Sequence, residues 1–150
     1  MNAKWVGFLR IVVGIFFISQ GLNKLEWYST SEFLKTSLDR YSLNAHPITL
    51  WYQDHVAKPG VEAWARLIPT GELLIGVGLV LGLLVRPTLI ITLLLVINFH
   101  VANGGLFSRT FFVSPYAMLL LASLVFLIFN NAGGAFALEK RVARKKPTSP

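Results

Sequence analysis

The sequence predicts an all-α integral membrane protein, a four-transmembrane-helix bundle with an extracytoplasmic helical loop between its first two helices. Hydrophobic residues make up 54% of the 150-residue chain, more than is typical of soluble domains. Charged residues are almost absent from several stretches of about 20 residues, the length that an α-helix needs to cross ~30 Å of hydrocarbon. We therefore divide the chain into a membrane domain, residues 1–138, and a basic tail, residues 139–150.

The predicted spans are residues 5–23, 67–85, 88–107 and 112–130. Arg86-Pro87 predicts a tight turn between the second and third spans, because proline lacks an amide hydrogen and disfavours helix in the residue before it. Asn103-Gly104-Gly105 is expected to end the third span, and Ser114-Pro115 to start the fourth. Residues 1–23 also resemble a signal peptide, but the run has no A-x-A-like site before Lys24, so we interpret it as a helix.

The positions of lysine and arginine predict the orientation. Basic residues gather directly after the last span, at Lys140, Arg141, Arg144, Lys145 and Lys146. Such short basic segments stay in the cytoplasm, so both termini and the Arg86 turn are expected there, with residues 24–66 and the turn at Arg109 outside. A net charge of +7 also suits nucleic acid, but a juxtamembrane tail favours anionic lipid headgroups. We expect the lipid bilayer, its anionic headgroups and protein partners in a membrane complex, and no nucleic acid.

The outer loop, residues 24–66, is too long and too aromatic for a simple linker. Ser29 and Glu32 have the spacing of a capping box, which predicts a helix through about Tyr41. Pro47 is expected to begin a second helix. The loop aromatics suit the headgroup zone, and they are Trp27, Tyr28, Trp51, Tyr52 and Trp64. We expect this segment to cover the outer end of the bundle, either as a simple anchor or as a recognition surface.

Glycines recur at heptad spacing and predict close helix packing. They are Gly7, Gly14 and Gly21 in the first span, and Gly71, Gly78 and Gly82 around the second. Small residues on one face let two helix backbones approach each other in a membrane. The Gly78-x-x-x-Gly82 pair is the small-residue motif of this set.

Polar residues of different spans are predicted to share one layer. At ~1.5 Å per residue, Gln20, Glu72 and His100 each lie roughly 20 Å from the inner surface. Asn98 lies just below them, and the residues just above are Asn23, Lys24, Arg66 and Asn103. Polar groups in a membrane normally face the bundle interior, so we expect these side chains to form a cluster. We assign chemistry to Glu72, His100 and Lys24, and ligand binding to Gln20, Asn23, Arg66 and Asn103.

The three residues to which we assign chemistry could instead have purely structural roles, and the sequence leaves both interpretations open. Lys24 can extend to the interface, and Glu72 can form an ion pair with Lys24 or Arg66. His100 can satisfy a structural hydrogen bond. Arg10 can snorkel to the cytoplasmic edge, bind a lipid headgroup or belong to the fold. His46 and His55 are too scattered for a metal site, and with no cysteine in the chain no covalently attached cofactor is expected.

Two stretches resemble a known family. "LRIVVGIFFISQGLNKL" and "GELLIGVGLVLGLLVRP", followed by a polar third span, are similar to the DoxX family of small bacterial and archaeal four-helix membrane proteins. The resemblance covers roughly residues 5–129. The recurring residues of the pattern match Arg10, Gly14, Gly21, Lys24, Glu72, Gly76, Gly82 and Arg86. It implies a multi-pass protein of the bacterial or archaeal plasma membrane. A DoxD branch of that family supplies a subunit of thiosulfate:quinone oxidoreductase, and other members are linked to oxidoreductase or oxidative-stress assemblies.

Two functions from different classes follow. In the first, the chain is the membrane subunit of a quinone-linked oxidoreductase assembly: a quinone head enters the polar layer, His100 or Lys24 donates to a carbonyl, and Glu72 exchanges the proton. In the second, it is a non-catalytic accessory or assembly subunit of a larger membrane complex, and the polar layer orients helices. A transporter is a third hypothesis, for which one polar layer offers no continuous polar path.

Overall fold

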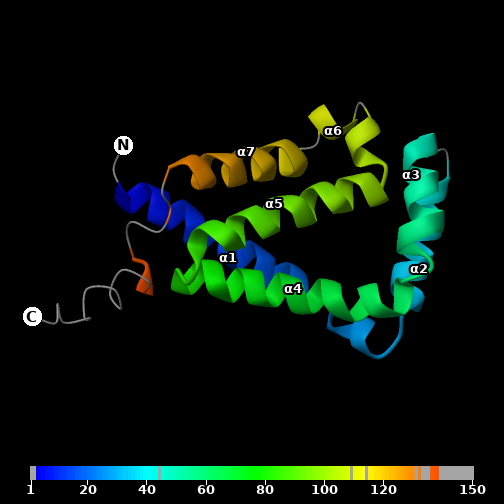
Figure 1. Ribbon diagram of the computed structural model, residues 1–150, viewed down its shortest axis with the longest axis horizontal. Helices are drawn as coiled ribbons and strands as arrows, with labels where there is room; N and C mark the ends of the chain where they lie inside the picture. The colour runs from blue at the N-terminus through cyan, green and yellow to red at the C-terminus, as the bar shows by residue number, and fades with distance from the viewer. Residues whose placement is uncertain are drawn as a thin grey trace, which may run out of the picture.

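The long helices of the chain run beside one another and two short helices lie across one end of them (Figure 1). The computed structural model describes residues 3–43, 45–108, 110–113, 115–130, 132 and 136–138. Within these residues all regular structure is helical. The bundle consists of α1 (Ala3–Leu22), α4 (Val61–Leu81), α5 (Val85–Ala102) and α7 (Pro115–Phe129). One end of the bundle is covered by α2 (Glu32–Ser42) and α3 (Pro47–Tyr52), together with the short helices η1 (Leu25–Tyr28) and η2 (Gln53–Ala57). We call residues 25–57 the cap.

Among the described residues, α1, α4 and α5 are long and apolar enough to cross a membrane. Long apolar helices thus form at the first three predicted spans, although α4 begins at Val61, six positions before residue 67, and α5 ends at Ala102 rather than at residue 107. The fourth apolar run forms a shorter helix, α7, of 15 residues, which begins at Pro115 as the sequence predicted. At ~1.5 Å per residue α7 extends about 22 Å, less than the ~30 Å of hydrocarbon. Short helices lead into α7, namely η3 (Gly105–Phe107) and α6 (Thr110–Val113).

The packing of α1 on α4 depends on Gly14 and Gly21, which belong to the predicted heptad pattern, and on Gly76, which does not. A Cβ at Gly76 would lie 2.7 Å from the backbone oxygen of Gly14, and one at Gly14 would lie 2.9 Å from the oxygen of Gly76. Gly21 faces Leu73 at a similar separation. By contrast, a Cβ at Gly71 would meet no atom within 4 Å among the described residues. Gly71 therefore contacts no other helix among the described residues. Gly78 instead lies nearest to Thr88 of α5, and a Cβ at Gly82 would lie 2.8 Å from the Arg10 side chain of α1 and 2.6 Å from the Cα of Ala137.

The turn between α4 and α5 lies earlier than Arg86-Pro87, and this corrects the predicted boundary. Gly82 ends α4 with φ of +70°, a left-handed conformation that glycine adopts without strain. Leu84 follows with φ of +43° and precedes the first residue of α5. Pro87 lies within the first turn of α5, where a backbone amide has no partner inside the helix and its absence costs nothing.

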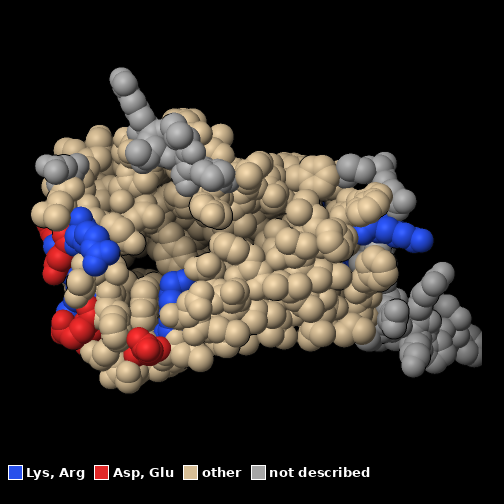
Figure 2. Space-filling view, turned by 180° about the vertical axis from the view of Figure 1, so that it is seen from behind, with Lys and Arg blue, Asp and Glu red and all other residues tan. Residues whose placement is uncertain are grey.

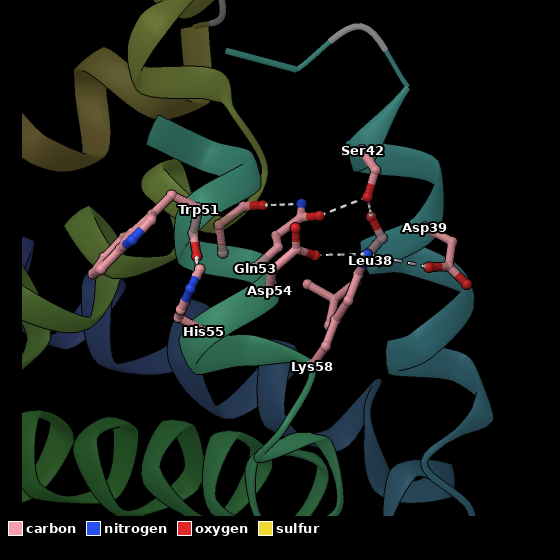
Figure 3. Close-up of polar contacts among 9 residues, drawn as sticks. Leu38, Asp39, Ser42, Trp51, Gln53, Asp54, His55 and Lys58 are labelled. Atoms are coloured by element: carbon pink, nitrogen blue, oxygen red, sulfur yellow. Dashed lines mark hydrogen bonds and ion pairs between the residues drawn. The ribbon is translucent and has the colours of Figure 1, made fainter. Parts of the chain in front are cut away.

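The cap is fastened to the last turn of α5 by polar side chains. Gln53 is fully buried and donates to the carbonyl of Ala102 at 2.7 Å, while the Ser42 hydroxyl donates to its Oε1 at 2.6 Å (Figure 3). Thr49 donates to the carbonyl of Val101 at 3.1 Å. These contacts reach carbonyls in the last turn of α5, so they hold α3 and η2 over the end of that helix.

The cap has its own apolar core and begins differently from the prediction. Leu34 and Leu38 of α2 are buried with Ala65 and Ile68 of α4. The predicted capping box does not form, because the Ser29 hydroxyl donates to the carbonyl of Glu26 instead. The N-cap of α2 is Ser31, whose hydroxyl bonds to Glu62 of α4. The helix at Pro47 is confirmed, and the His46 ring caps its first turn.

Arg10 lies at the opposite end of the bundle and is fully buried. It donates to the carbonyls of Ala132 at 3.0 Å and of Phe136 at 3.2 Å. The snorkelling role is therefore wrong, and Arg10 belongs to the fold by holding the segment after α7. The predicted turn residue Arg109 and the basic tail, residues 139–150, lie outside the described residues.

Candidate functional site

A cavity of about 390 Å³ lies between the cap and the bundle. Its size falls in the range of ~300–1,000 Å³ that small-molecule sites occupy. Its polar lining consists of Gln20, Lys24, Ser37, Tyr41, Tyr52, Glu72, Asn98, His100, Asn103 and Tyr116. Aromatic side chains form much of its remaining wall, and they are Phe16, Phe17, Trp27, Trp64 and Phe99. The cavity thus combines an aromatic wall with ionisable and hydrogen-bonding groups.

An ion pair between Lys24 and Glu72 lies in the wall of this cavity. The Lys24 ammonium donates to both carboxylate oxygens of Glu72, at 2.7 and 2.8 Å, and the Glu72 side chain is only 2% exposed. The same ammonium donates to the carbonyl of Gln20 at 3.3 Å and lies about 6 Å from the ring centroids of Trp27 and Phe99. All three hydrogens of Lys24 therefore have acceptors within the chain. This pairing selects Lys24, not Arg66, as the partner of Glu72.

The close approach of α1 and α4 explains how this pair forms. Lys24 follows the last turn of α1, and Glu72 lies near the middle of α4, 48 positions later in the chain. Gly21 and Gly76 let the two backbones approach each other closely near this pair. Because the helices are so close, the lysine reaches the carboxylate without leaving the bundle.

The hydrogen bond of His100 defines its tautomer. Its Nδ1 lies 2.8 Å from the carbonyl oxygen of Val96, in the preceding turn of α5. A carbonyl only accepts, so in the neutral ring Nδ1 carries the hydrogen and Nε2 is a hydrogen-bond acceptor. Phe111 packs edge-on against the ring with the centroids 5.3 Å apart. The neutral imidazole therefore accepts at Nε2, which is the opposite of the donor role that the sequence suggested.

Asn98 and Tyr52 form a second polar pair at the cavity. The Tyr52 hydroxyl donates to Asn98 Oδ1 at 2.5 Å and so links the cap to α5. Burial raises the pKa of Tyr52, while its hydrogen bond to Asn98 acts in the opposite direction. With Oδ1 occupied, the Asn98 amide hydrogens remain available for a ligand. Neither residue was among the predicted site residues: Asn98 was placed beside the polar layer, but no signal links it to a tyrosine 46 positions away.

The cavity brings together most, but not all, of the predicted site residues. Gln20, Lys24, Glu72, His100 and Asn103 line it. Asn103 also accepts at Oδ1 from the amide of Gly105 at 2.8 Å, which stabilises the turn after α5.

Asn23 and Arg66 do not line the cavity. Asn23 is exposed at the end of α1. Arg66 is exposed and donates to Glu62, one turn earlier, at 3.2 Å from Oε2. The face of α4 that lines the cavity carries Trp64, Ile68 and Glu72 at four-residue spacing. At about 100° per residue, Arg66 lies roughly 160° around the helix from Trp64 and Ile68 and roughly 120° from Glu72.

The fold and this cavity define a small helical integral membrane protein with a polar site enclosed within its bundle. Charged side chains gather at the two ends of the molecule, and the flank between them is nearly free of charge in the view of Figure 2. Such an uncharged flank is what lipid contact requires.

The chain belongs to the DoxX family, whose family model, described as DoxX, matches residues 6–105. This match confirms the resemblance found in the sequence, and it spans the first three long helices together with the cap. No curated protein and no solved structure matches the chain significantly.

Proposed function

We propose that this DoxX protein is the membrane subunit of a quinone-linked oxidoreductase assembly and that its cavity binds the quinone ring. The observation that carries the proposal is the meeting of aromatic walls with groups able to exchange protons at one site inside a membrane protein. Oxidation of a quinol to a quinone releases two electrons and two protons, and reduction of the quinone takes the same number up. The electrons are assigned to a redox partner in the assembly, and the protons to residues of this chain.

The donors and acceptors at the cavity suit the two ends of such a reaction. The free amide hydrogens of Asn98 can donate to a carbonyl oxygen, and Tyr52 orients that amide by occupying its oxygen. The Nε2 atom of neutral His100 can accept a hydrogen bond, and then a proton, from a hydroxyl group. His100 is therefore proposed as the group that holds or moves the proton at the ligand oxygen.

The Lys24–Glu72 pair supplies a proton-carrying group beside the aromatic wall. Because Lys24 already donates to Glu72 and Gln20, it is less suited to bind a ligand carbonyl than the sequence suggested. We propose instead that Glu72 receives the proton that leaves the cavity, with Lys24 compensating its charge. Gln20 and Asn103 are proposed to contact the ligand at the rim.

The proposal includes an orientation in the bacterial or archaeal plasma membrane. We propose that α1, α4, α5 and the segment containing α7 all cross, with both termini in the cytoplasm and the cap outside. The basic residues of the sequence after residue 138 support this orientation. The cavity then lies in the outer half of the bilayer.

The test is quinone binding by the full-length protein in nanodiscs, together with native mass spectrometry of the protein extracted from its own membranes. We expect decylubiquinone to bind and a redox partner to co-purify. His100→Gln should weaken binding about tenfold, as the loss of one buried hydrogen bond does, and Glu72→Gln should abolish quinone-dependent turnover. His55→Gln is the matched control, because His55 lies on the exposed side of the cap.

The opposite result would support the second hypothesis. Stoichiometric incorporation into a larger complex, with no quinone bound and no effect of either substitution on that complex, would identify an accessory subunit. The polar cluster would then serve to orient the helices.

A further inference from the structure

We propose that the cavity opens sideways to the lipid, between α1 and α7, and that its ligand is a membrane-dissolved molecule with a neutral polar head and an apolar tail. This inference rests on the cavity being the ligand site, as proposed above, but it does not depend on the head being a quinone.

The cap covers much of the cavity along the bundle axis, although Tyr41 of α2 lines it and is 42% exposed. Leu34 and Leu38 of α2 line the cavity and are buried against α4. Gln53 and Tyr52 tie the adjoining segment to α5 through Ala102 and Asn98. A ligand arriving along the axis from water would have to break this apolar core together with these hydrogen bonds.

The side of the cavity is bordered by residues that are also exposed. On α7, Tyr116 lines the cavity although it is 79% exposed, and Leu120 lines it while half-buried. On α1, Phe16 and Gln20 line it and are half-buried. A residue that belongs both to a cavity wall and to the outer surface marks an opening. Figure 2 shows a hollow at the cap end of the face that it presents.

The surface of the two bordering helices is apolar. The exposed neighbours on α1 include Ile15 and Leu22, and on α7 Leu119 is 66% exposed. Farther from the cap the same two helices share one core, to which Val13 and Leu124 belong. The opening is therefore confined to the cap end and faces the hydrocarbon that surrounds the bundle.

The interior favours a neutral head over an ion. Lys24 and Glu72 compensate each other at 2.7 Å, so the pair offers no net charge to a ligand. The remaining groups, His100 and Asn98, supply a neutral acceptor and a neutral donor. The polar head of the ligand would bind these two groups deep in the cavity. Its apolar tail would extend outward between α1 and α7, where the exposed side chains are apolar.

Photolabelling in nanodiscs tests this route. The probe is a long-chain alcohol that carries a diazirine close to its hydroxyl group, and adducts are located by mass spectrometry. We expect adducts on Phe17 and Ala117, which line the cavity and are buried from the bulk lipid. Leu120→Trp narrows the opening, so that about two methylene groups of the bound tail lose their buried position. The yield of these adducts should therefore fall about tenfold. Leu119→Trp, one position away on the lipid-facing surface, should leave them unchanged.

Two outcomes would overturn the route. One is labelling of exposed Leu119 without any adduct on Phe17 or Ala117. The other is an equal effect of the two tryptophan substitutions. Competition by excess decylubiquinone distinguishes the two proposals. Adducts that Leu120→Trp lowers but that decylubiquinone does not displace would refute quinone binding and still support entry of the ligand from the lipid.

Discussion

At the scale of single residues, the feature that distinguishes this bundle is a carboxylate paired with a lysine inside an otherwise apolar structure. Glu72 is 2% exposed and its partner Lys24 is 19% exposed. Removing one member of such a pair leaves an uncompensated charge, which costs more than the pair contributes when it is intact.

We therefore expect Lys24→Met to lower the free energy of unfolding by about 3–5 kcal/mol, measured by chemical unfolding in mixed micelles. The double variant Lys24→Met/Glu72→Met should recover most of this loss, because it removes both charges. Lys35→Met is the control, since Lys35 forms an exposed pair with Glu32 at 3.0 Å, and exposed pairs contribute little to stability. Equal losses for Lys24→Met and Lys35→Met would contradict a buried role for the pair.

How far the sequence could predict the site is clearest at His100. Its membership of a polar layer followed from counting residues along α5, and His100, Lys24 and Glu72 line the same cavity. Its tautomer could not be predicted, because it depends on whether the ring turns back to the carbonyl of Val96. Arg66, in contrast, was wrongly placed near the ligand. Its depth along α4 was estimated without knowing how the helix is rotated about its axis, and this rotation puts Arg66 beside Glu62 on the exposed face.

At the scale of elements, the contact of α1 with α4 depends on a few positions where a methyl group has no room. A Cβ at Gly76 would lie 2.7 Å from both the oxygen of Gly14 and the nitrogen of Ile18, and neither backbone atom can move alone. The heptad pattern indicated that glycines mediate packing, but the choice among them depends on which face α4 presents.

Gly76→Ala is expected to destabilise the protein by about 1–3 kcal/mol through overpacking. Gly71→Ala should change stability by no more than about 0.5 kcal/mol, as a surface substitution does, because its new methyl group meets open space among the described residues. Thermal unfolding of the detergent-solubilised variants measures both. If Gly71→Ala proved the more damaging of the two, the observed face of α4 would be incorrect.

At the scale of the whole molecule, the cap and the bundle enclose the cavity jointly. The cap supplies Trp27, Leu38 and Tyr52, while the bundle supplies the ion pair and His100. The loop aromatics that suggested a headgroup anchor thus have a further role, since Trp27, Tyr52 and Trp64 form part of the cavity wall. Trp51, in contrast, remains exposed on the cap.

The proposed orientation predicts which end is accessible from outside the cell. The chain contains no cysteine, so single cysteines can be introduced without background. A membrane-impermeant maleimide added to intact cells should label Thr36→Cys on the exposed surface of α2. It should label Leu83→Cys, in the turn between α4 and α5, only after permeabilisation. The reverse pattern would place the cap in the cytoplasm.

The sequence by itself determined that the chain forms long apolar helices, that ionisable groups interrupt them at few positions and that the family is DoxX. These properties depend on composition and on the order of residues along one segment. Only the tertiary structure decided that Lys24 pairs with Glu72, that Gly76 rather than Gly71 touches α1, and that Tyr52 reaches Asn98. The physical reason is rotation: each step along an α-helix turns a side chain by about 100°, so the partner of a residue depends on how its helix is packed.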